Sequence, residues 1–448
     1  MSTMSDMQKR ETLVLGMGLT GASIARWLKR QGRSAVFADT RLTVDTKAIY
    51  ESLPDAVVIT DADATVLEGM TEVIISPGVS DQDPLVSEIR ARDIPTHSDI
   101  TLFARDAAAP IVAVTGTNGK STVVSLLARM CQQADVAFAA GGNLGVPVLD
   151  LPEPGERGFY LLELSSFQLS RTPELALQCG CVLNIEPDHL DWHGDFSAYE
   201  AAKLSIYRNC AYAVVPSDHA WPSEVIDVDA VMIRFGKNLP EDARSFGVVE
   251  HEGRRYWASG AEPILAVEEA AMIGEHNVLN IAAALAIGSS IDLPLSAMVA
   301  AIRSFPGLDH RHQLVSVVDG VRYVDDSKAT NCAAALASAN AVPGPVVMLI
   351  GGLGKGEDYD AFSKQLPAHV RFAVAYGTIA TEVASALAQN GFDHAQAEDL
   401  PSALKAARAK VQPGDTVLLA PAAASQDAYP DYKARGKHFR QLIEGLAA

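Results

Sequence analysis

The residues with the clearest chemical potential lie in one short segment of the chain. Residues 111–114 are apolar and mostly β-branched, which is typical of a buried parallel strand. Gly116 and Gly119 follow, and glycine lets the backbone turn tightly and bring its N–H groups close to a ligand. Lys120 then adds a cation, and Ser121 and Thr122 stand where a helix would begin. A glycine loop before a helix N-terminus is typical of phosphate binding, with the hydroxyl beside the lysine as a Mg²⁺ ligand.

The strict P-loop pattern does not hold, because its first glycine would fall at Val114. We therefore expect a shortened phosphate loop that holds a nucleoside triphosphate. An ordinary strand-to-helix turn with a surface lysine is the alternative, and the coincidence of all these features in one segment argues against it. The predicted ATP contacts of the loop are Gly116, Thr117, Asn118, Gly119, Lys120, Ser121 and Thr122.

Two further strands are predicted to end in groups that suit a metal ion. Glu163 interrupts the apolar run 159–166, and a lone buried carboxylate is costly unless it is paired or bound to a cation. We read Glu163 as a Mg²⁺ ligand, with a charge on an edge strand as the alternative. The strand that begins at Cys181 leads into a polar loop, which is either solvated or completes the metal site opposite Glu163. The loop residues are Asp188, His189, Asp191 and His193.

Lys203 lies among apolar and small residues of a predicted helix over 196–207. A lysine is usually on a solvated face, but half-burial near metals would depress its pKa and open the amine to modification. A second predicted helix over 274–286 begins with His276, Asn277 and Asn280, which could face an adenine or a ribose. Helix capping by Asn277 is the competing explanation.

The N-terminal segment has the pattern of a dinucleotide fold. A strand over 12–15 precedes the glycine turn 16–21 and a helix over 22–30, and a second strand ends in Asp39. Taken alone, this spacing indicates a nicotinamide or flavin cofactor with Asp39 on a ribose. Such turns also bind other nucleotides or simply pack a helix on a strand.

The elements that position these groups form three α/β units. We predict a Rossmann-like N-terminal domain over 1–98, a P-loop-type ATPase domain over 99–304 and a doubly wound C-terminal domain over 305–448. In the last domain, a strand from Val321 ends in paired acids followed by Lys328, and the strand 346–351 leads to a glycine loop with Lys355. Residues 211–271 indicate only short strands and turns.

Composition sets limits on the partners. The 448 residues carry a net charge of −19, which opposes binding to nucleic acid or anionic membranes. The five cysteines are scattered without a CxxC pair, and Cys179 and Cys181 are expected as buried thiols of a reducing compartment. The N-terminus lacks the apolar run of a signal peptide, and no run could span a membrane. We expect a cytoplasmic enzyme that is a monomer.

Three α/β units with Gly116-Thr-Asn-Gly-Lys-Ser121 in the middle one resemble the Mur ligase family, ATP-dependent amide-forming enzymes of peptidoglycan synthesis. Gly18-Leu-Thr-Gly21, Asp325-Asp-Ser-Lys-Ala-Thr-Asn331 and Ala424-Ser-Gln-Asp427 resemble the branch that adds D-glutamate to UDP-N-acetylmuramoyl-L-alanine. Leu353 and Ala420 depart from the Asp and Ser common at those positions. The rivals are a ligase of the same family for another amino acid, a nicotinamide-dependent oxidoreductase and a nucleotide-switched binding protein.

The resemblance implies roles for individual residues. Lys120, Glu163, His189 and Lys203 would be catalytic, and Mg²⁺, as two ions, would bind through Ser121, Glu163, His189 and a carbamylated Lys203. ATP would also contact Asn277, Asn280, Arg311 and Asp326. The UDP substrate would lie against Leu19, Thr20, Asp39, Thr40, Arg41, Ser76, Gly78 and Asn143. The D-glutamate would be held by Lys328, Thr330, Lys355, Ser425 and Tyr432.

Overall fold

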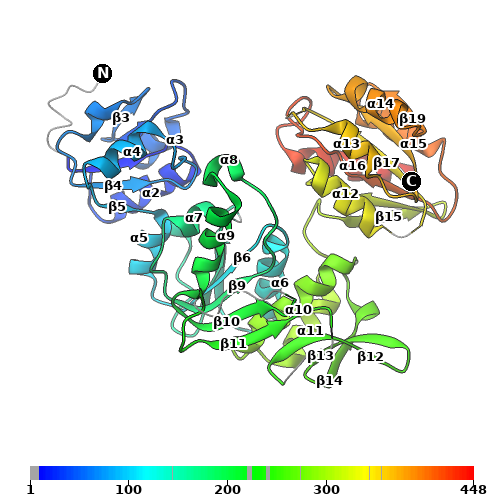
Figure 1. The fold of residues 1–448 in the computed structure, drawn as a ribbon, viewed down its shortest axis with the longest axis horizontal. Coiled ribbons are helices and arrows are strands. Elements are labelled where there is room, and N and C mark those ends of the chain that lie inside the picture. The colour runs from blue at the N-terminus through cyan, green and yellow to red at the C-terminus, as the bar shows by residue number, and fades with distance from the viewer. Residues whose placement is uncertain are drawn as a thin grey trace. The chain divides into compact units, whose positions relative to one another are not determined.

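The computed structural model describes residues 10–143, 145–218, 225–238, 243–272, 274–342, 344–354 and 356–447 (Figure 1). Within these residues the strands form three separate sheets, each covered by helices. This arrangement confirms the expected α/β fold class with three sheet-centred domains. In the same part of the chain, no helix is long and apolar enough to cross a membrane.

The N-terminal sheet has the order β3-β2-β1-β4-β5, and its strand pairs are parallel. Its central strand alternates: Leu13 and Leu15 join one apolar core, and Val14 joins the core on the other face. A parallel sheet is buried on both faces in this way because its crossover helices cover both. The elements are β1 (Thr12–Leu15), α2 (Leu19–Arg30), β2 (Val36–Asp39), α3 (Lys47–Ser52), β3 (Val57–Thr60), β4 (Glu72–Ile75), α4 (Pro84–Ala91) and β5 (Thr96–His97).

The middle sheet has the order β14-β13-β12-β11-β10-β9-β6-β8-β7 in the described residues. Its strands pair in parallel from β7 to β12, and β12, β13 and β14 continue it as an antiparallel meander. The strands are β6 (Ile111–Thr115), β7 (Phe138–Gly142), β8 (Phe159–Glu163), β9 (Leu177–Val182), β10 (Cys210–Pro216), β11 (Val231–Phe235), β12 (Ser245–His251), β13 (Arg254–Ser259) and β14 (Glu262–Ala266). Residues 211–271, which the sequence left without a role, therefore extend the sheet that carries the phosphate loop.

The helices that accompany the middle sheet begin with α5, which follows the last strand of the N-terminal sheet, and end before residue 305. The α-helical part of the predicted 196–207 helix stops at Leu204, where a 3₁₀ turn (Ser205–Tyr207) takes over. The helices are α5 (Asp99–Asp106), α6 (Lys120–Gln133), α7 (Ser166–Ser170), α8 (Leu190–His193), α9 (Phe196–Leu204), α10 (Glu275–Ser290) and α11 (Leu295–Ser304).

The C-terminal sheet has the order β15-β16-β20-β17-β18-β19, antiparallel between β15 and β16 and parallel elsewhere. Along β17, Met348 and Ile350 face one apolar core, and Val347 and Leu349 face the other. The elements are β15 (Gln313–Val318), β16 (Val321–Asp325), α12 (Cys332–Ala341), β17 (Val346–Gly351), α13 (Tyr359–Lys364), β18 (Val370–Tyr376), α14 (Ala380–Gln389), β19 (His394–Ala397), α15 (Leu400–Arg408), β20 (Thr416–Leu419) and α16 (Tyr432–Ala447).

The first two sheets belong to one compact unit, Met1–Ala270 with Asn277–Phe305, and the third belongs to another, Ala271–His276 with Pro306–Ala448. Within the first unit, the Arg26 guanidinium is paired with the Asp150 carboxylate at 2.6 Å. Arg171, at the end of α7, donates to the carbonyl oxygens of Ser76 and Val79 at 2.8 and 2.6 Å. The N-terminal sheet is therefore held to the middle sheet by named polar contacts, and the boundaries at 98/99 and 304/305 remain predictions.

Candidate functional site

The phosphate loop lies between the C-terminal end of β6 and the N-terminus of α6. Gly116 has φ 152° and Gly119 has φ 86°, a left-handed conformation that glycine adopts without strain. Gly119 is the N-cap of α6, so the first N–H groups of the helix, beginning at Lys120, open toward the loop. A side chain at position 119 would overlap Asn280 Oδ1. The backbone geometry is thus that of an anion-binding helix N-terminus, as the sequence predicted.

A second segment, the loop after β9, holds the phosphate loop in shape. Asn118 N–H donates to Asn184 Oδ1 at 2.8 Å, and Asn184 Nδ2 donates to Asn118 O at 3.1 Å. Thr117 Oγ1 lies 2.9 Å from the Tyr199 hydroxyl and accepts from the Glu186 N–H at 3.0 Å. These supports were missed from the sequence. Their only local signal was their place after a buried strand, where the polar loop was noted for its carboxylates and histidines.

Two lysine ammonium groups meet at one carbonyl of the phosphate loop. Lys120 Nζ donates to Gly116 O at 2.7 Å and to Thr117 O at 2.9 Å, and Lys203 Nζ donates to Gly116 O at 2.8 Å. Lys203 is only 2 % exposed. Burial, followed by repulsion from Lys120, lowers the pKa of Lys203 from 10.5 to about 7, against the opposing pull of Asp188 and Glu163. The structure therefore gives Lys203 the depressed pKa that the sequence analysis expected, but the side chain is buried rather than half-buried.

Glu163 ends β8, an interior strand that pairs with β6 on one side and with the edge strand β7 on the other. The edge-strand explanation for its charge is therefore wrong. The side chain is buried, at 2 % exposure, and its Oε1 accepts from Asn143 Nδ2 at 2.5 Å. Its Oε2 is buried with no hydrogen-bond partner in the described residues. A buried carboxylate oxygen without a partner is costly, and a cation is one way to satisfy it.

The histidines of the loop after β9 take different positions. His189 is the left-handed residue that begins α8 (φ 53°), and its half-exposed ring lies 3.5 Å from an Asp188 carboxylate oxygen. His193 Nε2 lies 2.9 Å from Ser166 Oγ, which puts this ring against α7. Among the described residues, no trio of His, Cys, Asp or Glu side chains is grouped closely enough to hold a metal. The predicted ligand set therefore depends on Ser121 and a modified Lys203 in addition to Glu163 and His189.

The predicted nucleotide contacts of α10 lie beside the loop. Asn277 is the third residue of this helix and so is not its N-cap. Asn280 Nδ2 donates to Asn277 Oδ1 at 3.1 Å, and Asn280 is the residue that a Cβ at Gly119 would strike. The structure thus places the Asn277–Asn280 pair against the phosphate loop.

The N-terminal glycine turn is supported by two neighbouring strand ends. Asp39, at the end of β2, accepts from the Met17 N–H at 3.0 Å and is paired with Arg41 at 2.7 Å. Burial alone would raise the pKa of Asp39, but these hydrogen bonds hold it below its ordinary value. Ser76, at the end of β4, donates from its Oγ to Gly16 O at 3.0 Å. The two sides of the predicted UDP site thus converge on the residues of the turn.

The remaining members of this set lie around the same turn. Leu19 and Thr20 begin α2 directly after the N-cap Gly18, three residues earlier than the predicted helix start. Leu19 is 79 % exposed. Thr40 Oγ1 donates to Asp83 Oδ2 at 3.0 Å, and Gly78 is exposed in the turn after β4. An exposed leucine at the mouth of a glycine turn is free to contact a ligand.

The C-terminal unit carries the other predicted contacts at the ends of its parallel strands. Asp326 follows β16, and partial burial raises its pKa to about 6, with Asp325 acting in the same direction and Arg311 against it. Lys328 Nζ lies 4.7 Å from the centre of the Tyr432 ring at the start of α16. Thr330 N–H donates to Lys328 O at 2.7 Å. The fold therefore brings Lys328 and Tyr432 together, and Thr330 is joined to Lys328 through the backbone.

Ser425 is buried in the turn that follows β20, on the same side of the sheet as these strand ends. Leu353 and Ala424 form a backbone bridge, so the glycine loop after β17 is joined to the turn that contains Ser425. Lys355, together with the side chains of Asp191 and His276, lies outside the described residues.

Comparison with known proteins agrees with this arrangement. The Mur ligase MurD-like N-terminal domain model matches residues 10–98, the Mur ligase middle domain model residues 114–288, and the Mur ligase glutamate ligase domain model residues 310–423. A UDP-N-acetylmuramoylalanine–D-glutamate ligase of Nitrosococcus oceani is 39 % identical over 97 % of this chain and 96 % of its own length. The enzyme of the same name from Marinobacter nauticus is 39 % identical over 98 % of each chain.

This chain belongs to the Mur ligase family.

Solved structures show the same fold at lower identity. The UDP-N-acetylmuramate-alanine ligase MurC of Thermotoga maritima has a TM-score of 0.60 and 17 % identity, covering 97 % of this Mur ligase and 99 % of that chain. A bifunctional folylpolyglutamate synthase/dihydrofolate synthase of Yersinia pestis, complexed with AMPPNP and a Mn ion, has a TM-score of 0.55 and 18 % identity, covering 77 % and 93 %. At these identities the likeness concerns the fold alone.

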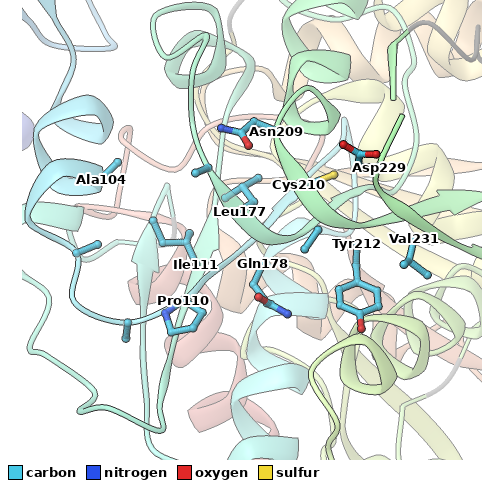
Figure 2. A pocket seen from close by; sticks show the side chains of 14 residues that line it. Ala104, Pro110, Ile111, Leu177, Gln178, Asn209, Cys210, Tyr212, Asp229 and Val231 are labelled. Atoms are coloured by element: carbon cyan, nitrogen blue, oxygen red, sulfur yellow. The ribbon is translucent and has the colours of Figure 1, made fainter. Parts of the chain in front are cut away.

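A cavity of about 760 Å³ in this ligase lies away from the candidate site (Figure 2). It is lined by Ile111, Leu177, Cys210 and Val231, which are at or near the N-terminal ends of β6, β9, β10 and β11. The phosphate loop follows the C-terminal end of β6, at the opposite edge of the sheet. Ligands of open α/β sheets bind at the carboxyl ends of strands, so this cavity is not part of the candidate site.

Proposed function

We propose that this Mur ligase joins the alanyl carboxylate of UDP-N-acetylmuramoyl-L-alanine to the amine of D-glutamate, with conversion of ATP to ADP and phosphate, in peptidoglycan precursor synthesis. The near-full-length identity to ligases named for this reaction is the observation that carries the proposal. The phosphate loop, the half-neutral Lys203 and the buried Glu163 support the ATP-dependent part of it.

The reaction requires activation of a carboxylate, which is a poor acyl donor. An oxygen of the alanyl carboxylate attacks the γ-phosphorus of ATP, the bond to the bridging oxygen breaks, and ADP leaves. The D-glutamate amine then attacks the carbon of the resulting acyl phosphate, phosphate leaves, and the new amide nitrogen loses a proton. Lys120 and the N–H groups of α6 would stabilise negative charge on the phosphoryl oxygens, as cations and oriented dipoles do in phosphoryl transfer.

The residues present fit a divalent cation. Glu163 Oε2 is buried without a hydrogen-bond partner among the described residues, and a carboxylate oxygen is a preferred ligand of Mg²⁺. In our proposal Ser121, Glu163, His189 and a carbamylated Lys203 hold two ions. Bound Mg²⁺ would offset charge on the phosphate oxygens.

The environment of Lys203 supports its proposed carbamylation. The neutral amine attacks the carbon of CO₂, the N–C bond forms, and one proton is released to solvent. A pKa of about 7 leaves a large share of the amine neutral at physiological pH, whereas an ordinary lysine is almost entirely protonated. The product carries a carboxylate at the end of the long side chain. This carboxylate can bind a metal ion, whereas the ammonium group of an unmodified lysine cannot.

We propose that the glycine turn with Leu19, Thr20, Asp39, Thr40 and Arg41 binds the UDP group, together with Ser76, Gly78 and Asn143. Asn277, Asn280, Arg311 and Asp326 complete the ATP site, and Lys328, Thr330, Lys355, Ser425 and Tyr432 hold D-glutamate.

The proposal includes a monomeric enzyme of the cytoplasm. The five cysteines are free thiols, as expected in a reducing compartment. The net charge of −19 argues against nucleic acid as a partner.

Phosphate release from ATP in the presence of Mg²⁺ and UDP-N-acetylmuramoyl-L-alanine tests the function. D-Glu, L-Glu, L-Ala and diaminopimelate are offered in turn, and we expect release with D-Glu alone. Release with a different amino acid would keep the ligase and replace the substrate. No release with any of them would refute the proposed function.

A further inference from the structure

The C-terminal unit contains one fully buried arginine that the reaction scheme does not use. Arg435 lies in the first turn of α16 and is 1 % exposed. Its guanidinium donates to neutral oxygens at the ends of three parallel strands. The acceptors are Ser327 Oγ at 3.0 Å, Ser327 O at 2.9 Å, Gly351 O at 3.2 Å, Ala423 O at 3.1 Å and Ala424 O at 3.1 Å.

These acceptors adjoin the residues proposed to hold D-glutamate. Ser327 precedes Lys328, and Ala424 precedes Ser425. Ser327 Oγ in turn donates to the carbonyl of Tyr432 at 2.8 Å, so the start of α16 is fastened to the end of β16. The Arg435 side chain therefore connects the start of α16 to the segments that follow β16 and β20.

The loop after β17 is held by the same guanidinium. Gly351 ends this strand, and a Cβ at Gly352 would lie 2.9 Å from Arg435 Nη1 and overlap Ala424 O. Leu353 exchanges two backbone hydrogen bonds with Ala424, at 2.9 and 3.0 Å. The position of this loop thus depends on the contact between Arg435 and the 423–424 turn.

The turn itself is in a conformation that needs support. Ala422 has φ 52°, a left-handed conformation that is strained for an alanine. Its N–H donates to Ala329 O at 2.9 Å, and its carbonyl accepts from the Tyr359 hydroxyl at 3.2 Å. Strain of this kind persists only where surrounding contacts fix it, and the two carbonyls that follow are fixed by Arg435.

The guanidinium of Arg435 donates to neutral oxygen atoms and forms no ion pair with the described residues. In the described part of the chain, no carboxylate lies within ion-pair distance of its guanidinium, although Arg440 on the same helix pairs with Asp325 at 3.1 Å. The carboxylate of Asp427, in the neighbouring turn, is directed at Thr378. A buried cation without a counter-ion is costly, and its field is only weakly screened, so it favours the binding of an anion.

We propose that Arg435 is a positioning and specificity-determining residue for the incoming amino acid. It fixes the segments that carry Lys328, Ser425 and Tyr432, and its unpaired charge selects a substrate with a side-chain carboxylate over one with a neutral side chain. The inference rests on the proposed function, because it concerns the D-glutamate site of that reaction.

Two substitutions separate the two roles. Arg435→Lys keeps the charge but loses the planar fork that binds several carbonyls at once, whereas Arg435→Gln loses the charge as well. We expect the KM for D-glutamate to rise at least tenfold in both variants, with KM values for ATP and UDP substrate changing less than threefold. The preference for D-glutamate over D-glutamine, as a ratio of kcat/KM, should fall at least tenfold in Arg435→Gln and stay within threefold of wild type in Arg435→Lys.

Arg440→Gln is the matched control. It removes the same charge from the same helix, but the Arg440 guanidinium is already neutralised by carboxylates. The control should keep the preference for D-glutamate over D-glutamine within twofold of wild type.

The outcomes distinguish the inference from the proposed function. A wild-type enzyme that responds only to a neutral amino acid would overturn both. A D-glutamate-dependent wild type with an unchanged preference in Arg435→Gln, or with equal losses for both amino acids and for ATP, would overturn the inference alone. If Arg435→Gln does not fold, the lysine variant decides, because an unchanged KM for D-glutamate there would refute positioning by Arg435.

Discussion

The contact between Gly119 and Asn280 allows a quantitative test of the phosphate loop. In Gly119→Ala, the new methyl group would occupy a left-handed residue with φ 86°, which costs an L-amino acid roughly 1–2 kcal/mol. It would also overlap Asn280 Oδ1 and lie 3.2 Å from Leu183 Cδ1. Overpacking of this kind costs about 1–3 kcal/mol.

Gly155→Ala is the control for the free-energy cost of placing an alanine at a positive φ. Gly155 has φ 81°, close to that of Gly119, but a Cβ there would meet no atom within 4 Å. Both variants carry the free-energy cost of placing an alanine in the left-handed conformation. Any difference between them in KM for ATP or in stability therefore reports the displacement of Asn280 and of the loop. If the displacement costs about 1–3 kcal/mol of the free energy of nucleotide binding, the affinity for the nucleotide becomes roughly 5- to 150-fold weaker.

The assay is the KM for ATP at saturating concentrations of the other substrates, together with urea unfolding of both variants. We expect Gly119→Ala to raise the KM for ATP at least fivefold and Gly155→Ala to leave it within twofold of wild type. Urea unfolding should show Gly119→Ala to be the less stable of the two. Equal KM values for ATP in the two variants would refute the reasoning, since the contact with Asn280 would then have no effect on the nucleotide.

Three further predictions concern single side chains. Lys120→Ala should abolish ATP-dependent turnover and leave the calorimetric affinity for the UDP substrate within threefold, because Lys120 Nζ donates to the phosphate-loop carbonyls of Gly116 and Thr117; full activity would exclude the loop assignment. Glu163→Gln should raise the Mg²⁺ concentration needed for half-maximal rate about tenfold or more, and an unchanged Mg²⁺ dependence would remove Glu163 from the metal site. Burial raises the pKa of Asp99 to about 6 from 3.8, so this carboxyl lowers stability as pH rises from about 4 to 6. Asp99→Asn should therefore stabilise the protein against urea by up to about 3 kcal/mol at pH 7.5 and hardly at pH 4, and an equal effect at both pH values would contradict this sign.

The local features of the site could be predicted from the sequence because their causes are local. Gly116 and Gly119 adopt backbone conformations that other residues rarely reach, so their spacing after a β-branched run already indicated the loop. Glu163 was recognised as a lone charge in an apolar strand, and the structure confirms that it is buried there. Lys203 was recognised in the same way from the apolar residues around it.

Other features depended on contacts between distant parts of the chain. Nothing near Asn184 in the sequence shows that its side-chain amide forms hydrogen bonds with the backbone of Asn118, 66 residues away. The strands of 211–271 were visible only as short segments, because their pairing with β10 and with one another is a property of the assembled sheet. The edge-strand explanation for Glu163 failed for the same reason, since strand order is set by the packing of all crossover connections.

Arg435 shows most clearly what the tertiary structure alone decided. In the sequence it is an arginine among Lys433, Lys437 and Arg440, and composition gives no reason to separate it from a solvated helix face. Only the fold brings it against carbonyls that are 12, 84 and 108 residues away and excludes water from it. The sequence by itself determined the family, the loop and the groups that can act on phosphate, because these follow from local conformation and residue chemistry. The burial of a side chain and the charges around it depend on residues that are distant in the sequence, so only the folded chain determines them.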